Sequence, residues 1–157
     1  MSNAARRLGQ GYYWQDLHEG DTFQTFQRTV TETDLVNFIS VTGMLEELFI
    51  DARHDGGLMG GRVVPAALTY SLIEGMLLQT MIQGTGIALL EAHMTALRPV
   101  RVGDTIHAEV TVSLVKPVAG GERAIVRSDV SVANQAREVV LTYLVTRMLA
   151  GRAALSR

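Results

Sequence analysis

The segment PAALTYSLIEGMLLQTMI, residues 65–82, decides the fold of this chain. A proline opens it, and the fixed φ and missing N–H of proline suit the first turn of a helix. From Ala66 to Ile82 apolar residues fall on every side of the helix, a pattern typical of a helix that is buried all round. Gly75 costs about 0.8–1 kcal/mol relative to alanine in a helix, which indicates close packing there. Because a membrane span needs about 20 mainly apolar residues, the central Glu74 favours a buried helix without a membrane span.

Apolar and polar residues alternate in four segments after this helix, as in strands that are buried on one face. The residues predicted to face inward are Leu90, Ala92, Met94 and Ala96; Ile106, Ala108, Val110, Val112 and Leu114; Ala124, Val126, Val130 and Val132; and Val139, Leu141, Tyr143 and Val145. Upstream, residues 22–30 predict one strand, Thr31 or Thr33 caps a helix that ends at Thr42-Gly43, and residues 44–62 are irregular. This order predicts an α+β fold in which one antiparallel sheet curls around one long helix.

Nothing in the sequence divides the chain. Residues 12–149 are therefore predicted to form a single domain, between loose ends at residues 1–11 and 150–157. The side of the helix that the sheet leaves uncovered, and the long strand edges, call for a partner chain. We expect a homodimer.

The composition excludes several classes of function. The 157 residues carry a net charge of −2, with a pI near 6.1, so we expect no nucleic-acid partner and no attraction to anionic membranes. No cysteine is present, which excludes disulfides and thiolate chemistry. The N-terminus has no apolar segment typical of a secretory signal, and we expect a cytoplasmic protein. The histidines, which are His18, His54, His93 and His107, lack metal-ligand spacing, and we expect no metal.

Several motifs resemble one known family. They are TETDLVNF at residues 31–38 followed by Thr42-Gly43, GGRV at residues 60–63, and RPV at residues 98–100 followed by VGDT at residues 102–105. In this order and spacing they resemble the MaoC-like (R)-specific enoyl-CoA hydratases and acyl dehydratases, from about Tyr12 to Met148. The resemblance implies a hotdog fold that is usually dimeric. It also implies acyl thioesters of coenzyme A or of carrier protein as substrates, with no further cofactor.

The chain departs from that family at the residues of the reaction. After Thr-Gly the family has the pattern Asp-x-Asn-Pro-x-His-x-Asp, whereas residues 44–51 read MLEELFID. Met44 stands at the aspartate position, Phe49 at the histidine position, and only the final acid, Asp51, is kept. A thioether and a phenyl ring transfer no proton, and each positioned acid or base is worth about 10²- to 10⁴-fold in rate. The departure therefore argues against the family's standard hydration reaction.

The loop nevertheless offers other acid or base groups. Glu46, Glu47 and Asp51 are the candidate catalytic carboxylates, and the competing interpretation is solvated loop charge. His54 and Asp55 could form a general base with the acid that orients it. The competing interpretation is that both are exposed loop residues. The family has His-Gly where this chain has Pro65-Ala66. The backbone N–H of Ala66 can still bind the thioester oxygen there, because a backbone donor survives side-chain replacement.

Three further groups could serve binding. The glycine-rich stretch at residues 56–61, with Gly60 and Gly61, permits close backbone approach to a ligand or is a flexible turn. The guanidinium groups of Arg62, Arg98 and Arg101 could pair with the phosphates of coenzyme A or be structural. An apolar tunnel for an acyl chain is predicted from Met44, Phe49, Leu58, Met59 and Tyr70, although core packing competes for Tyr70.

Three functions remain open from the sequence. The first is a hydratase or dehydratase of acyl thioesters with substituted acid/base groups. The second is a non-catalytic acyl-thioester-binding subunit that pairs with an active hotdog chain in a heteromer. The third is an acyl-CoA thioesterase, which uses a carboxylate and needs no histidine.

Overall fold

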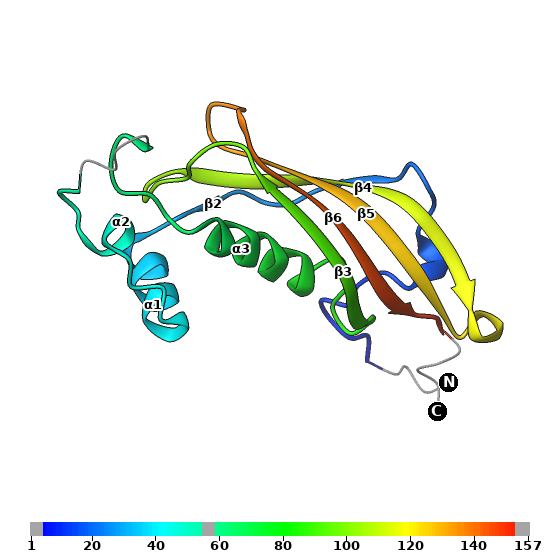
Figure 1. The fold of residues 1–157 in the computed structure, drawn as a ribbon. Coiled ribbons are helices and arrows are strands. Elements are labelled where there is room, and N and C mark those ends of the chain that lie inside the picture. Colours follow the sequence, from blue (N-terminus) through cyan, green and yellow to red (C-terminus); the bar gives the residue numbers. More distant parts are fainter. Residues whose placement is uncertain (1–4, 55–58, 153–157) are drawn as a thin grey trace.

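The computed structural model of the chain describes residues 5–54 and 59–152. Their strands form one curved antiparallel sheet that arches over a single long helix, α3 (Figure 1). In chain order the elements are η1 (Trp14–Asp16), β1 (Thr22–Gln24), β2 (Arg28–Thr29), α1 (Glu32–Thr42), α2 (Glu47–Ile50), α3 (Ala66–Gln79), β3 (Gly86–Ala96), β4 (Thr105–Val118), η3 (Ala119–Gly121), β5 (Arg123–Ala133) and β6 (Val139–Ala150). The α+β arrangement of a sheet around a helix is the predicted one.

The sheet has the order β1-β4-β5-β6-β3, and β2 pairs with the start of β4, whereas β1 pairs with its middle, at residues 109–111. The core lies between the concave face of this sheet and α3. On the helix it consists of Leu68, Leu72, Ile73, Met76 and Leu77, and on the sheet it includes Ile106, Val110, Val126, Val132 and Val145. This core holds the start of α3 against the ends of β3 and β6, where the pocket described below is found.

The entrance to α1 is fixed by a reciprocal cap. Thr31 caps the helix: its side chain accepts a hydrogen bond from the Asp34 N–H at 3.1 Å, and the Asp34 carboxylate accepts one from the Thr31 N–H at 2.9 Å. Arg28 also donates to Asp34 at 2.8 Å. Burial opposes charge on Asp34, but the hydrogen bonds from Thr31 and Arg28 outweigh it and hold the pKa of this carboxyl below its usual value. Gly43 ends the helix at φ 75°.

The prediction that the long helix is buried on every side is wrong for the single chain. Ser71, Leu78 and Gln79 are exposed, because the sheet covers only one side of α3. The helix also ends at Gln79 rather than at Ile82, and Pro65 is its N-cap rather than a residue of the first turn.

The prediction of one inward face for residues 90–96 is also wrong for the single chain. Every residue of β3 is exposed, since this strand lies at the edge of the sheet and α3 does not cover it. Leu89 and Leu90 are 55% and 49% exposed. An apolar edge strand of this kind is a surface that invites a second chain.

Three smaller predictions are corrected by local structure. The strand expected over residues 22–30 is split into β1 and β2 at Thr25, whose hydroxyl accepts from the Ala108 N–H at 2.8 Å. The irregular segment contains the short helix α2. A bulge in β4 between Val112 and Leu114 shifts the alternation, so that Val115 and not Leu114 packs against the core.

Two residues assigned to loose ends are packed. Gly11 is buried and its N–H donates to the Gln83 carbonyl at 2.8 Å, while buried Gly151 donates to the Glu122 carbonyl at 2.7 Å. The packed region therefore reaches beyond the range 12–149 at both sides, and Ala150 belongs to β6. The single-domain division of the chain stays a prediction.

Candidate functional site: an apolar pocket at the start of α3

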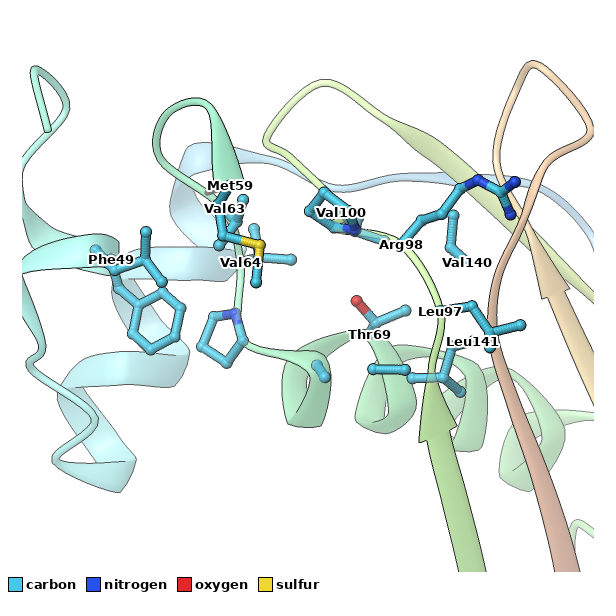
Figure 2. Close-up of a pocket in the computed structure, with 15 residues that line it drawn as sticks. Phe49, Met59, Val63, Val64, Thr69, Leu97, Arg98, Val100, Val140 and Leu141 are labelled. Carbon is cyan, nitrogen blue, oxygen red and sulfur yellow. The ribbon is translucent and has the colours of Figure 1, made fainter. Parts of the chain in front are cut away.

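A pocket of about 290 Å³ lies where α3 begins, beneath the turn that follows β3 (Figure 2). This volume is at the lower end of the range for small-molecule sites, roughly 300–1,000 Å³. It is lined by Leu48, Phe49 and Met59, by residues 63–66 and Thr69, by residues 96–100, and by Val140 and Leu141. Most of these side chains are hydrocarbon, so the pocket suits an apolar group.

The N-terminal end of α3 opens on this pocket. The first N–H groups of a helix have no partner inside it, and the helix dipole makes that end attractive to negative charge. Leu68 and Thr69 both donate to the Pro65 carbonyl, at 2.9 and 3.3 Å. Within residues 5–54 and 59–152, no backbone acceptor takes the N–H of Ala66. Ala66 thus lines the pocket, and its backbone N–H has no backbone acceptor in the described part of the chain.

Only two of the described lining residues have polar side chains. Thr69 is 1% exposed, and its hydroxyl has no hydrogen-bond partner among the residues that the structure describes. Arg98 lies at the rim, 52% exposed, and donates to the Val139 carbonyl at 3.0 Å. The described part of the lining therefore contains no carboxylate and no imidazole that could act as an acid or base.

The candidate carboxylates lie outside the pocket. Glu46 caps α2, its carboxylate accepting from the Leu48 N–H at 2.9 Å, and Asp51 accepts from the Arg53 N–H at 2.9 Å. Glu47 is an exposed residue of the first turn of α2. In the single chain these three residues serve the local structure of the loop or face solvent, as the competing interpretation holds.

The two residues at the family's acid/base positions have different environments. Phe49 lines the pocket and packs against the core, so it contributes apolar surface at the histidine position. Met44 is 39% exposed and is not among the described lining residues. Of the apolar tunnel predicted from the sequence, Phe49 and Met59 are in place, and Leu58 lies outside the described residues.

Two of the three arginines that could bind phosphate, Arg62 and Arg101, have structural contacts with the loop that carries Phe49 and Met59. Arg62 donates from Nε to the Phe49 carbonyl at 2.8 Å and pairs with Glu32 at 2.6 Å. Arg101 donates to the carbonyls of Arg62, at 2.9 Å, and Met59. Gly60 and Gly61, at φ 65° and 120°, lie close to the Arg101 guanidinium. Their positive φ lets the chain turn here, which is the structural use of glycine.

The remaining sequence candidates contribute no site. His54 is described but Asp55 is not, so their predicted pairing lies outside the described residues, as does the start of the glycine-rich stretch. Tyr70 packs edge-on against Tyr143, with ring centroids 5.0 Å apart. Among the described residues no group of three or more histidines, aspartates and glutamates could hold a metal ion. In the same ranges, no helix has the length and apolar character needed to span a membrane.

One buried polar cluster next to Tyr70 was not predicted from the sequence. Glu74 of α3 pairs with Arg147 of β6 and accepts a hydrogen bond from the Tyr143 hydroxyl at 2.7 Å. Burial and the nearby Glu74 charge raise the pKa of Tyr143, so it remains a donor. Sequence signals existed: Glu74 interrupts an apolar helix, and Arg147 continues the inward alternation of Tyr143 and Val145.

Comparison with known proteins identifies the family. A model described as a MaoC like domain matches residues 16–136, and the chain belongs to this family. The chain is also similar to a Klebsiella aerogenes protein named protein MaoC, with 27% identity over 100 residues. The match covers 63% of this chain and 30% of that protein, so the chain spans less than a third of the relative's length.

Solved structures share the fold. A MaoC-like dehydratase from Rhodospirillum rubrum superposes with a TM-score of 0.81 and 24% identity, covering 90% of this chain and 99% of that one. A Mycobacterium tuberculosis protein with a double hotdog fold gives 0.79 and 20%, covering 93% and 46%. The HadBC complex, a 3R-hydroxyacyl-ACP dehydratase from the same organism, gives 0.67 and 17%, covering 83% and 96%. The fold of this chain is the hotdog fold.

Proposed function

We propose that this chain binds acyl thioesters, of coenzyme A or of carrier protein, at the pocket where α3 begins. The observation that carries the proposal is an apolar pocket lined by Ala66, whose backbone N–H has no backbone acceptor among residues 5–54 and 59–152. The pocket suits an acyl chain, and the helix N-terminus suits the partly negative oxygen of a thioester. Membership of the MaoC-like family supports the same ligand class.

Between chemistry and binding, the geometry favours a binding subunit. The described lining lacks an acid or base, while Glu46, Glu47 and Asp51 are engaged with their own loop or exposed. Syn hydration needs one group to activate water and another to supply a proton. A partner hotdog chain that brings these groups would complete the reaction, as in a heteromeric dehydratase.

The partner surface that we propose consists of the exposed strand β3 and the uncovered side of α3. It carries apolar side chains, among them Leu78, Ile87, Leu89, Leu90 and Met94. Pairing of β3 with an edge strand of a second chain would satisfy its free backbone groups and bury this surface. Both a homodimer and a heteromer would use this surface. Light scattering of the purified protein distinguishes a homodimer from a monomer that requires a different partner chain.

Binding and turnover are measured separately. Calorimetry with butyryl-CoA tests the pocket, and hydration of crotonyl-CoA, followed by loss of the enoyl absorbance, tests the chemistry. The binding subunit predicts affinity without turnover by the protein alone, and turnover only when an active hotdog partner is added. Absence of any acyl-CoA affinity, together with absence of butyryl-pantetheine affinity, would contradict the thioester proposal.

If the protein alone is active, variants identify the residue responsible. If Glu46→Gln, Glu47→Gln or Asp51→Asn abolishes hydration, the chain is itself a hydratase with a substituted acid or base. Release of free thiol from butyryl-CoA would point to a thioesterase. The matched control is Glu109→Gln, which changes an exposed carboxylate of β4 away from the pocket.

A further inference from the structure

The pocket contains one buried hydroxyl, that of Thr69, which has no hydrogen-bond partner among the described residues. The residue is 1% exposed. Buried polar groups in proteins are nearly always hydrogen-bonded, because an unmade bond leaves the cost of desolvation uncompensated. A ligand that brings an oxygen atom into the pocket would supply the missing partner.

Two other hydroxyls of the same helix make a hydrogen bond that Thr69 lacks. The Ser71 hydroxyl donates to the Ala67 carbonyl at 2.7 Å, and the Thr80 hydroxyl donates to the Met76 carbonyl at 2.7 Å. Such bonds to the carbonyl four residues earlier are the usual arrangement for serine and threonine in helices. For Thr69 that carbonyl belongs to Pro65, which accepts backbone N–H groups only.

The orientation of Thr69 brings its hydroxyl toward the helix N-terminus. Thr69 follows Ala66 by three residues, so the two lie on the same side of α3. Side chains in a helix lean toward its N-terminus, which is where the unbonded N–H groups point. Both residues line the pocket, and Figure 2 shows the Thr69 oxygen directed away from the helix, on the side of Val64 and Val100.

We propose that the Thr69 hydroxyl and the backbone N–H at the start of α3 bind one and the same carbonyl oxygen of the ligand. A carbonyl oxygen has two lone pairs and accepts two such bonds. This inference rests on the proposed function, because the carbonyl is taken to be that of the thioester. The hydroxyl lies behind the surface of the pocket. We infer that a ligand reaches it after a change of rotamer in the apolar lining, a common change on binding; Leu97, which lines the same pocket, is half exposed.

The test compares two ligands that differ only in the carbonyl. S-butyryl-pantetheine carries the arm that coenzyme A and carrier protein share, and S-butyl-pantetheine is its thioether. The wild-type protein is expected to bind the thioester more tightly. Thr69→Val keeps the size of the side chain and removes the donor. It should weaken thioester binding by about tenfold and change thioether binding by less than about twofold. Thr69→Ser, which keeps the hydroxyl, should retain most of the preference.

Infrared spectroscopy provides a second readout that packing does not move. Hydrogen-bond donors polarise a carbonyl and lower its stretching frequency. With a thioester labelled with ¹³C at the carbonyl, the bound band of wild type and Thr69→Ser should lie below that of Thr69→Val. Equal frequencies in Thr69→Val and wild type would overturn the inference.

The matched control is Thr85→Val. Thr85 is also 1% exposed with an unpartnered hydroxyl, but it lies between α3 and β3 and is not part of the pocket. This variant should leave both affinities unchanged. If Thr69→Val leaves the thioester preference intact, or weakens both ligands equally, the Thr69 inference is wrong. If neither ligand binds the wild type, the proposed function itself fails.

Discussion

Thr69 and Glu74 are two polar residues of α3 that face the interior, and they differ in whether their side chains have polar partners. Around Glu74 every partner is present: Arg147 pairs with it and Tyr143 donates to it, with the Glu74 and Arg147 side chains only 14% and 10% exposed. Around Thr69 the described residues, 5–54 and 59–152, provide no hydrogen-bond partner. One helix thus carries a complete polar network in its middle and an incomplete one near its start.

The difference separates structure from binding. A buried network whose members satisfy one another fixes the packing of the elements that carry it, and here it ties α3 to β6. A buried donor without a partner does not stabilise the fold, and in a pocket a ligand can supply the missing partner. Thr69 lines the pocket at the helix N-terminus and Glu74 does not, so the proposed binding site is at the helix N-terminus rather than at the ion pair.

The largest expected effect comes from breaking the complete network. Glu74→Leu leaves the Arg147 guanidinium buried without its carboxylate, and we expect a loss of about 3–5 kcal/mol in the free energy of unfolding. Urea denaturation measures it. The double variant Glu74→Leu with Arg147→Met removes both charges and should recover most of the loss. A single variant as stable as wild type would show that the pair is solvated.

Removing the unpartnered hydroxyl should have the opposite sign. Thr69→Val in the ligand-free protein deletes a buried donor that makes no bond, and we expect a gain of about 1–2 kcal/mol. The midpoint temperature of thermal unfolding, Tm, should rise by roughly 2–4 °C per kcal/mol for a chain of this size. Thr85→Val should give a similar gain. A loss of stability in Thr69→Val would mean that its hydroxyl has a partner in solution.

A partly exposed, satisfied carboxylate should fall between these cases. Asp34→Asn weakens the cap of α1 and the bond from Arg28, and we expect a loss of about 1 kcal/mol at pH 7. The pKa of Asp34 is lower in the folded than in the unfolded protein, so its contribution is present above the unfolded pKa and is lost as pH falls through the folded pKa. The stability difference between wild type and Asp34→Asn should therefore shrink below about pH 4. A difference that stays constant down to pH 2 would contradict the lowered pKa.

The smallest effects are expected in the loop. Glu46→Gln, Glu47→Gln and Asp51→Asn should each change the free energy of unfolding by less than about 0.5 kcal/mol, because these residues are exposed and make only local contacts. Chemical denaturation of the three variants checks this. The result also matters for the turnover assay, since an activity lost without a loss of stability belongs to the chemistry.

Local patterns predicted the main elements correctly. Thr31 and Gly43 mark the ends of α1, and apolar alternation marks β4, β5 and β6, because capping and side-chain periodicity depend on residues within a few positions of one another. Ala66 and Phe49 were also assigned to the pocket from the family resemblance, and the structure places both there. The bulge in β4 was missed because it depends on how β4 pairs with β5.

The polar chemistry of the pocket could not be predicted in the same way. The partners of Glu74 lie 69 and 73 residues away in the chain, and nothing near position 74 reveals them. The sequence left open whether Arg62 and Arg101 are structural or bind phosphate, and in the fold both donate to backbone carbonyls of a loop whose path could not be predicted. The carboxylates of residues 46, 47 and 51 are not among the described residues that line the pocket, although their place in the motif suggested a site there.

The sequence by itself determined the order of elements, the long apolar helix and the family, because these depend on short-range periodicity and on motifs. Only the tertiary structure decided which polar groups are satisfied, which strand is left exposed at the edge, and where the pocket lies. Burial and hydrogen bonding are properties of groups brought together from distant parts of the chain. For that reason Thr69, an ordinary threonine in the sequence, is recognised as a candidate binding group only in the fold.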